Sequence, residues 1–421
     1  MELKPGYKQT EVGVIPVQWN LRSICTFAEV RGRVGWKGYT KKDLVAYGPY
    51  AIGAKHIDSH NRLDLSDPTF LSATKYLESP EIMVQPGDIL IVQRGTIGKL
   101  VLIDRNIGDA TINPSMVIIR SRNVSPAFVT YYLLSYSGQK QILADTSSTG
   151  VPMISQKQIE SFQIPTPPTK AEQEVIAEAL SDADALIESL EQLITKKRHL
   201  KKGAMQELLT GKKRLPGFSG EWEVKRLGNT AFIKARIGWQ GLTTAEYLDS
   251  GDYYLVTGTD FKEGYIDWSN CHCVAEGRYK QDKNIQLKEH DVLVTKDGTI
   301  GKVALINHLD KPATLKSGVF VIRPMEDAFH PDFFYFLLCS TVFTQFLLQL
   351  SAGSTINHLY QKDFVDFIYT TPSKIEEQID IAAILSDMDA EVAALEAKLA
   401  KARQIKEGMM QELLTGGIRL I

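Results

Sequence analysis

Two stretches with the same plan, SDADALIESLEQ at residues 181–192 and SDMDAEVAALEA at residues 386–397, decide the fold of this chain. Apolar residues in and around them recur at alternating steps of three and four, the spacing of a helix that buries one seam against a partner helix. The first seam comprises Ile176, Leu180, Ala183, Ile187, Leu190 and Ile194, and the second runs from Ile381 to Leu413. Either stripe alone would suit an amphipathic surface helix, but two stripes in matching positions favour pairing of the two helices with each other.

The rest of the chain repeats in the same way. RGRVGWKGYT at 31–40 aligns with KARIGWQGLT at 234–243, and GDILIVQRGTIGKLVLI at 87–103 aligns with HDVLVTKDGTIGKVALI at 290–306, each at an offset of 203 residues. The offset then grows to 205, at which MQELLTG at 205–211 recurs at 410–416. A single duplication predicts a pseudo-two-fold molecule, because a solenoid needs about three or more repeats.

Each half combines a globular part with a long helix. Short alternating apolar runs, such as Ile89 and Ile91, are separated by Gly and Pro turn signals and predict mixed α/β domains. We therefore expect an α+β fold in which two tandem mixed α/β domains are separated by two long helices that form an antiparallel coiled coil. The expected divisions are residues 1–165, 166–211, 212–370 and 371–421. A helix from Thr169 to Leu209 would be about 60 Å long, a rigid spacer.

The ends of the expected helices carry their own signals. Thr169 and Glu172 have the spacing of a capping box at the start of the first helix. Gly211 and Gly416 stand where helix-terminating glycines belong.

Composition bounds the class of protein. The chain has 421 residues, of which 43% are hydrophobic and 23% charged, values typical of a globular protein with two to three domains. A formal net charge of −2 argues against a uniformly basic nucleic-acid binder but is compatible with a local basic face. The four cysteines make no disulfide framework, no apolar run reaches membrane-spanning length, and the N-terminus lacks the apolar region of a signal peptide. We therefore expect a cytoplasmic protein.

The pentapeptide GTIGK, at residues 95–99 and again at 298–302, suggests a phosphate-binding loop. A nucleotide-binding P-loop, however, needs four residues between its glycines and a Ser or Thr after its lysine. Only two residues separate Gly95 from Gly98, and Leu100 follows Lys99. ATP binding is therefore disfavoured, and the turn is either a contact for other phosphates or a plain β-turn between two strands.

Several motifs together resemble the specificity subunit of a type I restriction-modification system. They are GYKQTEVGVIPVQW at 6–19, the repeated GTIGK, IPTPPTKAEQEVIAEALSDADALI at 164–187, TPSKIEEQIDIAAILSDMDA at 371–390, and ELLTG at the end of each long helix. The resemblance covers essentially the whole chain, and the order of these elements makes it specific.

The resemblance implies two target-recognition domains, each reading one half of a bipartite, asymmetric DNA sequence, and helices that set the gap between the halves. It implies no catalytic centre, cofactor or metal site in this chain. The partners would be double-stranded DNA, two methylation subunits that methylate adenine, and ATP-dependent restriction subunits. S-adenosylmethionine, ATP and Mg²⁺ would be bound by those partner subunits.

Catalytic motifs are missing from the sequence, in agreement with that division of labour. Asn113-Pro114-Ser115-Met116 lacks the last two residues of an adenine-methylation loop, and no His-Glu-x-x-His occurs. Glu396 and Lys398 lie in the middle of a heptad helix, where solvated charges are expected.

Three surfaces have side chains suited to DNA. In the first, the GTIGK turns present glycine backbone, threonine and lysine to phosphates, whereas the preceding Gln93-Arg94 and Lys296-Asp297 would read different bases. Its residues are Gln93, Arg94, Thr96, Lys99, Lys296, Asp297, Thr299 and Lys302. Because Arg suits guanine and Asp suits cytosine, unlike half-sites are expected.

The other two surfaces are a basic-aromatic segment and a polar loop in each half. The segment comprises Arg31, Arg33, Trp36 and Lys37, with Lys234, Arg236, Trp239 and Gln240 as its counterparts. Basic residues around an aromatic ring suit a clamp on the DNA backbone, but the tryptophans equally suit core anchors. The polar loops contribute Ser148 and Thr149, with Ser354 and Thr355, and such loops are also often merely exposed to solvent.

Three alternatives to this function are compatible with the sequence. The chain could be a coiled-coil adaptor or scaffold whose heads bind protein, and salt-sensitive binding to duplex DNA would distinguish that case. It could instead be the specificity part of a system with methylation and cleavage fused in one partner. A head that hydrolyses nucleotide is the third alternative, and no motif supports it.

Overall fold

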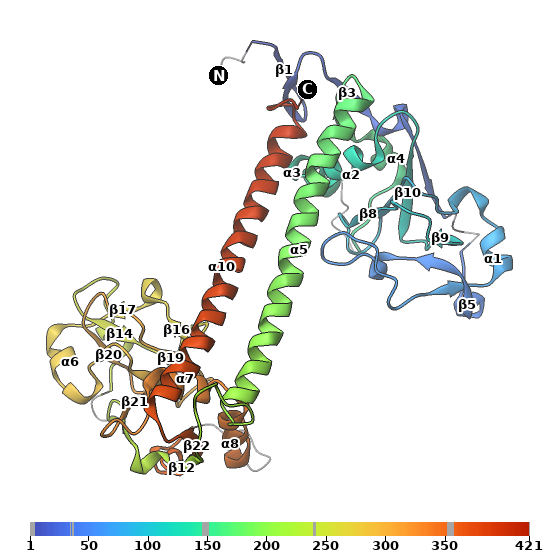
Figure 1. Ribbon diagram of the computed structural model, residues 1–421. Coiled ribbons are helices and arrows are strands. Elements are labelled where there is room, and N and C mark those ends of the chain that lie inside the picture. Colours follow the sequence, from blue (N-terminus) through green and yellow to red (C-terminus); the bar gives the residue numbers. More distant parts are fainter. Residues whose placement is uncertain are drawn as a thin grey trace. The chain divides into compact units, whose positions relative to one another are not determined.

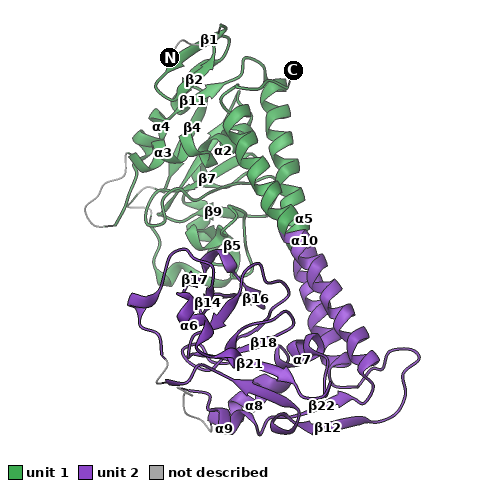
Figure 2. Ribbon diagram, turned by 90° about the vertical axis from the view of Figure 1, so that its left-hand side faces the viewer, with its two compact units in different colours: residues 1–191, 397–421 green, residues 192–396 purple. Residues whose placement is uncertain are grey.

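The computed structural model describes residues 5–33, 35, 38–144, 151–238, 241–351 and 358–420. They divide into two compact units, unit 1 with residues 1–191 and 397–421 and unit 2 with residues 192–396 (Figure 2). Each unit therefore contains one globular domain together with one end of each long helix.

The two long helices are α5 (Lys170–Leu208) and α10 (Ile375–Leu413), each of 39 residues (Figure 1). In unit 1, Asp184 of α5 pairs with Lys406 of α10 at 2.5 Å, and Glu191 pairs with Arg403 at 2.6 Å. The residue numbers of these partners rise along α5 while they fall along α10, so the two helices are antiparallel. Of the seam residues predicted for α5, Ile176, Leu180 and Ile194 are buried, whereas Ala183, Ile187 and Leu190 are only partly buried.

Ion pairs between the two helices and their flanks repeat from one unit to the other. Unit 1 contains Glu172–Arg419, Asp184–Lys406 and Glu191–Arg403, and unit 2 contains Glu377–Arg214, Asp389–Lys201 and Glu396–Arg198. Each acidic residue of unit 1 has its counterpart 205 positions later in the sequence, and each basic residue has its counterpart 205 positions earlier. The two shifts together give the ion pairs of unit 2. The duplication read from the sequence is thus expressed in the pairing register of the helices.

The start of α5 corrects one sequence expectation. The hydroxyl of Thr169 accepts a hydrogen bond from the backbone N–H of Glu172 at 3.2 Å, which is the first half of a capping box. The Glu172 carboxylate, however, is almost fully buried and receives Nε and Nη2 of Arg419 at 2.7 and 2.9 Å. The residue expected to complete a local cap is instead one member of a long-range ion pair.

Gly211 and Gly416 end the long helices with φ angles of 70° and 73°, as predicted for helix-terminating glycines. A Cβ at Gly211 would lie 3.2 Å from the ring of Trp222, and a Cβ at Gly416 would lie 3.2 Å from the ring of Trp19. The Tyr7 hydroxyl also donates to the carbonyl of Gly416 at 3.0 Å. The N-terminal segment therefore packs on the end of α10 as the segment after residue 211 packs on the end of α5.

The domain of unit 1 is built on a four-stranded antiparallel sheet of order β4-β10-β7-β8 and a three-stranded sheet of order β6-β5-β9. Its elements are β1 (Tyr7–Thr10), β2 (Gly13–Pro16), β3 (Asn20–Ser23), β4 (Ala28–Gly32), β5 (Leu44–Ile52), β6 (Phe70–Leu71), α1 (Ala73–Leu77), β7 (Asp88–Val92), β8 (Leu100–Leu102), β9 (Ala110–Ile112), β10 (Met116–Ser121), α2 (Pro126–Leu134), α3 (Tyr136–Ala144), α4 (Gln156–Ser161) and β11 (Gln163–Thr166). Successive side chains of β7 point to opposite faces, so Ile89 and Ile91 join an inner core with α2 and α5, whereas Leu90 and Val92 join a separate outer core.

The domain of unit 2 repeats this plan, with sheet orders β13-β21-β18-β19 and β17-β14-β20. Its elements are β12 (Trp222–Arg226), β13 (Ala231–Lys234), β14 (Tyr254–Val256), β15 (Phe261–Lys262), β16 (Tyr265–Ile266), β17 (His272–Cys273), α6 (Glu276–Lys280), β18 (Val292–Thr295), β19 (Val303–Leu305), β20 (Ala313–Leu315), β21 (Val319–Pro324), α7 (Pro331–Leu338), α8 (Thr341–Ser351), α9 (Gln361–Phe364) and β22 (Ile368–Pro372). The register is also repeated, since Ile118 faces Leu90 in unit 1 and Val321 faces Leu293 in unit 2. The predicted α+β fold, with two mixed domains and paired antiparallel helices, is confirmed.

Within the described part of the chain, no single helix is both long and apolar enough to cross a membrane. One bent pair, α7 with α8, meets the length and composition criteria only when its two helices are taken together.

Candidate nucleic-acid interface

Each domain carries its GTIGK turn at the same edge of its main sheet. Residues 95–99 join β7 to β8 in unit 1, and residues 298–302 join β18 to β19 in unit 2. Gly95 and Gly298, the first glycine of each turn, have positive φ angles of 91° and 70°, and a Cβ at either would meet nothing within 4 Å. The first glycine therefore leaves room for the close approach of a phosphate.

The second glycine of each turn has a packing role that the sequence did not reveal. A Cβ at Gly98 would lie 2.5 Å from Oε1 of Gln139 on α3, and the Gln139 amide donates to the Gly98 carbonyl at 3.0 Å. A Cβ at Gly301 would meet the side chain of Leu347 on α8. Positive φ angles of 92° at Gly98 and 81° at Gly301, together with this contact to a helix of the same domain, account for the second glycine.

Polar residues of the two turns are not equally accessible. Thr96, Thr299 and Lys302 are exposed, as a phosphate contact requires. Lys99 is half-buried, and its ammonium donates to the carbonyl of Ile57 at 3.2 Å. The two lysines predicted to be equivalent therefore differ, and only that of unit 2 lies on the surface.

Gln93 and Lys296, the first residue of each predicted reading pair, are engaged inside their own domains. The Gln93 amide donates to the carbonyl of Pro114 at 2.9 Å. The Lys296 side chain is 14% exposed, and its Nζ lies 5.6 Å from the centroid of the Phe320 ring. Arg94 and Asp297, the second residue of each pair, remain candidates for contact with bases, and Oδ2 of Asp297 already lies 3.6 Å from Nζ of Lys296.

Arg94 and Asp297 each face a neighbour that no local sequence pattern indicates. Arg94 forms an antiparallel bridge with Met153, and Asp297 forms the same bridge with His358, which lies 205 residues after Met153. Arg94 is exposed and the Met153 side chain is partly so, at 43%. In unit 2, Nδ1 of His358 contacts Oδ1 of Asp297 directly, and the imidazole lies 4.4 Å from the ring of Tyr360. One scaffold therefore presents a guanidinium with a thioether in unit 1 and a carboxylate with an imidazole in unit 2.

Arg33 and Arg236 correct the prediction for the basic-aromatic segment, because both are buried, with 5% and 2% of their surface exposed. Nε of Arg33 donates to the carbonyl of Ile112 on β9 at 3.1 Å, and Nε of Arg236 donates to that of Leu315 on β20 at 2.8 Å. A second hydrogen bond in each case goes to a threonine hydroxyl of the same strand. Burial lowers the pKa of both guanidinium groups. Both arginines therefore hold a strand of their own domain, β9 or β20, and are not exposed as the prediction requires.

The remaining predicted residues lie either on the surface or outside the described part of the chain. Arg31 and Lys234 are exposed, and Arg31 forms an ion pair with Glu29 at 3.4 Å. Trp36, Lys37, Ser148, Thr149, Trp239, Gln240, Ser354 and Thr355 lie outside the described residues, so their DNA contacts stay predictions.

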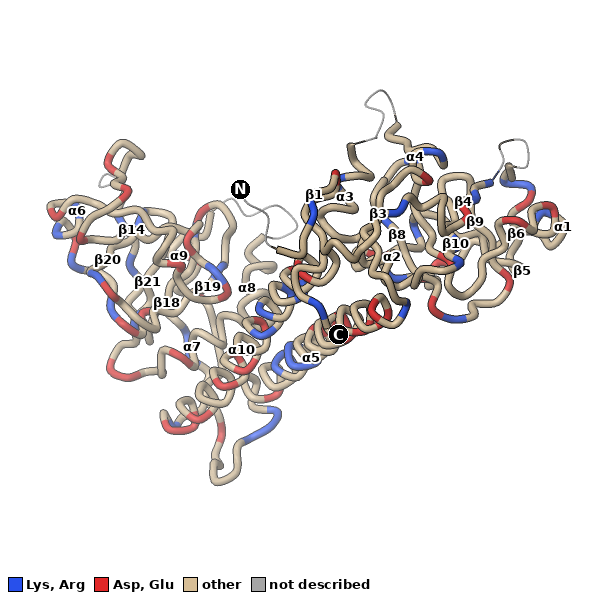
Figure 3. Tube along the Cα trace, turned by 90° about the horizontal axis from the view of Figure 1, so that it is seen from above, with Lys and Arg blue, Asp and Glu red and all other residues tan. Residues whose placement is uncertain are grey.

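Charges of both signs are interspersed over the molecule. Both signs occur along α5 and α10 (Figure 3), but in each helix a stretch of acidic residues, Glu172–Glu191 in α5 and Glu376–Glu396 in α10, precedes a stretch of basic ones. Over the described residues, no group of three or more His, Cys, Asp or Glu side chains is arranged to hold a metal ion.

Known proteins share this architecture. The type I restriction enzyme MjaVIII specificity subunit of Methanocaldococcus jannaschii is 26% identical over 368 residues, which cover 83% of each chain. The crystal structure of a type I restriction-modification S subunit from M. genitalium superposes with a TM-score of 0.61 at 17% identity, over 98% of both chains. A chain from a structure of a type I restriction-modification system that addresses complex assembly gives a TM-score of 0.55 at 17% identity, over 96% of this chain and 99% of that one.

The family model for the type I restriction modification DNA specificity domain matches twice, at residues 40–196 and 219–404. The two matches fall on the two halves of the repeat and together include most of the sequence. The chain therefore belongs to the type I restriction-modification DNA specificity family, with one copy of the family domain in each half.

Proposed function

We propose that this chain is the DNA-reading subunit of a type I restriction-modification enzyme and has no catalytic centre of its own. Each domain reads one half of a bipartite, asymmetric site, and the paired helices set the gap between the halves. The observation that carries the proposal is the unlike chemistry at equivalent positions, Arg94 with Met153 in unit 1 and Asp297 with His358 in unit 2. A guanidinium matches the acceptors of guanine, whereas a carboxylate matches the amino group of cytosine.

The proposed partners are two methylation subunits and the restriction subunits, which would hold S-adenosylmethionine, ATP and Mg²⁺. Leu186, Leu193 and Leu200 support a partner on the helices, because they recur every seven residues along α5 and remain 37–55% exposed. An apolar hollow beside Leu186 is lined also by Ala402 and Ile405 of α10. We propose that the methylation subunits dock on this face, and that the complex works in the cytoplasm, where its DNA lies.

Binding of duplex DNA is the first test of this function. The chain, purified together with the subunits that accompany it from its host, should bind duplex DNA with an affinity that falls steeply as the salt concentration rises. Each phosphate that the protein neutralises releases counterions, so log affinity plotted against log salt concentration should fall with a slope of about −0.9 per phosphate contact. Fluorescence anisotropy at several NaCl concentrations measures this slope. A salt-independent affinity, or no binding at all, would favour the adaptor with protein-binding heads.

Arg94→Ala tests the reading position in unit 1. We expect the variant to lose discrimination at one base of one half-site by about 1–3 kcal/mol, roughly 5- to 150-fold, because a bidentate contact to guanine is removed. Selection of bound duplexes from a random library, followed by sequencing, measures that preference. Asp297→Ala is the matched variant and should relax one base of the other half-site only. A uniform loss of affinity at all sequences would instead make Arg94 a phosphate contact.

A further inference from the structure

The outer part of the domain in unit 1 reaches its long helix through a loop of charged residues. Asp58 organises this loop by accepting hydrogen bonds from the backbone N–H groups of His60 at 2.8 Å and Arg62 at 2.9 Å, and from Nε of Arg62 at 3.1 Å. Partial burial raises the pKa of Asp58, but these hydrogen bonds outweigh it and hold the pKa below its ordinary value. The loop therefore presents Arg62 in a fixed direction.

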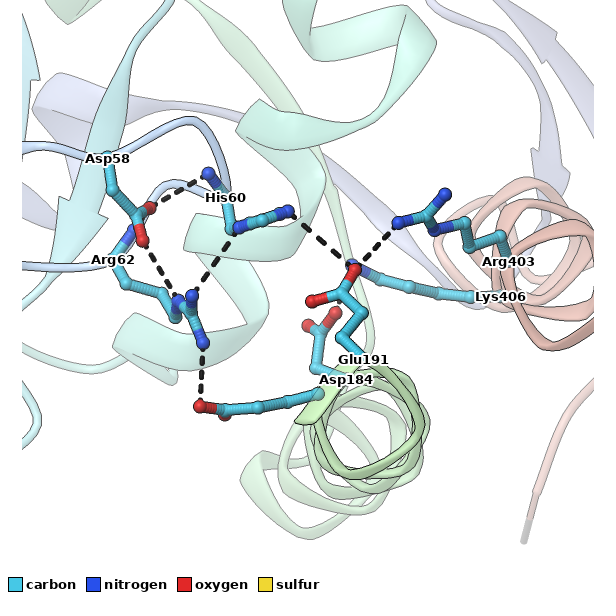
Figure 4. A network of polar contacts seen from close by, with 8 residues as sticks. Asp58, His60, Arg62, Asp184, Glu191, Arg403 and Lys406 are labelled. Atoms are coloured by element: carbon cyan, nitrogen blue, oxygen red, sulfur yellow. Dashed lines mark hydrogen bonds and ion pairs between the residues drawn. The ribbon is translucent and has the colours of Figure 1, made fainter. Parts of the chain in front are cut away.

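This loop contacts two carboxylates of α5 (Figure 4). Nη1 of Arg62 lies 2.8 Å from Oε1 of Glu188, and Nε2 of His60 lies 3.8 Å from Oε1 of Glu191. Glu191 is shared, because Arg403 of α10 pairs with the same oxygen at 2.6 Å. Polar contacts thus connect the outer part of the domain, through α5, to the second long helix.

Unit 2 holds the corresponding hairpin in a different way. In unit 1, Ile57 and Leu63 form a β-bridge, and in unit 2 the corresponding residues Phe261 and Ile266 are paired. Arg62 comes just before Leu63 and Tyr265 just before Ile266, so Tyr265 occupies the position of Arg62. The Tyr265 ring lies 6.1 Å from that of Tyr335 and packs on the core that includes Leu385 of α10. Burial raises the pKa of the Tyr265 hydroxyl.

The helix side of the contact differs between the units as well. At the position of Glu188, 205 residues further along, the second long helix has Ala393. In unit 2, therefore, both members of the Arg62–Glu188 pair are replaced, the arginine by Tyr265 and the carboxylate by Ala393.

We propose that Arg62, assisted by His60, is a positioning residue that fixes the first recognition domain against its spacer helix through a salt-sensitive contact, whereas the corresponding hairpin of the second domain packs through Tyr265 on α7 and on an apolar core that α7 shares with α10. This inference rests on the proposed function, because the position of the reader relative to the spacer decides which gap between half-sites is accepted. Arg62 and Glu188 are each 47% exposed, so salt screens their attraction, whereas the apolar contact of Tyr265 does not depend on screening.

Charge reversal tests the contact. Arg62→Glu faces Glu188 with a like charge, and the double variant Arg62→Glu with Glu188→Arg restores an opposite pair. Lys262→Glu is the matched control, because Lys262 is an exposed basic residue of the corresponding hairpin in unit 2. Hydrogen-deuterium exchange of residues 56–64 in the full chain, at low and high NaCl, reports whether the loop is held.

We expect exchange in this segment to rise about fivefold in Arg62→Glu at low salt and to rise in the wild type as NaCl increases. In the double variant it should fall part of the way back, because the pair with position 188 is restored while the carboxylate at position 62 still faces Asp58. In duplex selection, Arg62→Glu should accept gaps one base pair longer or shorter with unchanged bases in both half-sites, and Lys262→Glu should behave as wild type. Unchanged exchange, or a double variant as loose as the single one, would overturn the contact. If exchange of the loop rises but the range of accepted gaps between half-sites does not widen, the positioning role of Arg62 is overturned. If the wild type selects no bipartite site, the proposed function is overturned instead.

Discussion

Arg214→Met should lower the stability of unit 2 strongly, because it removes the partner of a buried carboxylate. Nε and Nη2 of Arg214 bind the two carboxylate oxygens of Glu377 at 2.6 and 2.7 Å, and the Glu377 side chain is only 2% exposed. Methionine keeps the aliphatic stem but leaves a buried carboxylate without its partner. Differential scanning calorimetry should show the transition of unit 2 lowered by roughly 10 °C.

Matched variants separate this effect from a general loss of charge. Arg419→Met should act in the same way on unit 1 through Glu172, the counterpart of Glu377. Lys170→Met removes an exposed pair with Glu174 and should cost less than about 1 kcal/mol. Arg214→Met with Glu377→Met should recover most of the loss, because no uncompensated charge is left. Equal transition temperatures for Arg214→Met and Lys170→Met would refute the buried-pair argument.

Removal of one heptad from each long helix should shorten the gap between half-sites by about three base pairs and abolish recognition of the original site. The deletion takes out residues 192–198 of α5 and 397–403 of α10. Seven residues correspond to about 10 Å of helix, and B-DNA advances about 3.4 Å per base pair. Pairing of Asp184 with Lys406 and of Lys201 with Asp389 is kept in register, since both helices lose the same length between these pairs.

Methylated-adenine mapping in a host that carries the deleted chain would measure the new gap. The bases of both half-sites should stay as they were, since neither domain is altered. Deletion from α5 alone is the control, and it should lower thermal stability because it puts the ion pairs on one side of the cut out of register. An unchanged gap in a folded double deletion would remove the idea that the helices act as a ruler.

Features that recur along the chain were predictable from the sequence. Heptad spacing marks Ile176 and Leu180 as seam residues because a helix repeats its faces every 3.6 residues, and both are fully buried. The duplication then indicated a partner for that seam. Gly211 and Gly416 were identified because helix termination needs a positive φ angle, which glycine adopts without strain.

Features made by residues far apart in the sequence were not predictable. Arg33 reads as a surface residue beside tryptophan, and only its hydrogen bond to Ile112, 79 residues away, shows that it fastens a strand. The contact of His358 with Asp297 spans 61 residues and has no local signal. The 205-residue offset aligns His358 with Met153, but it gives no reason to place either beside a turn.

The packing at the two helix ends has a consequence for substitutions at the helix-terminating glycines. Trp222, shortly after α5 in the sequence, covers Gly211, whereas Pro16 and Trp19, far from α10 in the sequence, cover Gly416. A side chain at either glycine would meet these rings in addition to the strain of a positive φ angle. Each helix end and the segment that covers it therefore form one structural element, although only one of the two is made of residues close together in the sequence.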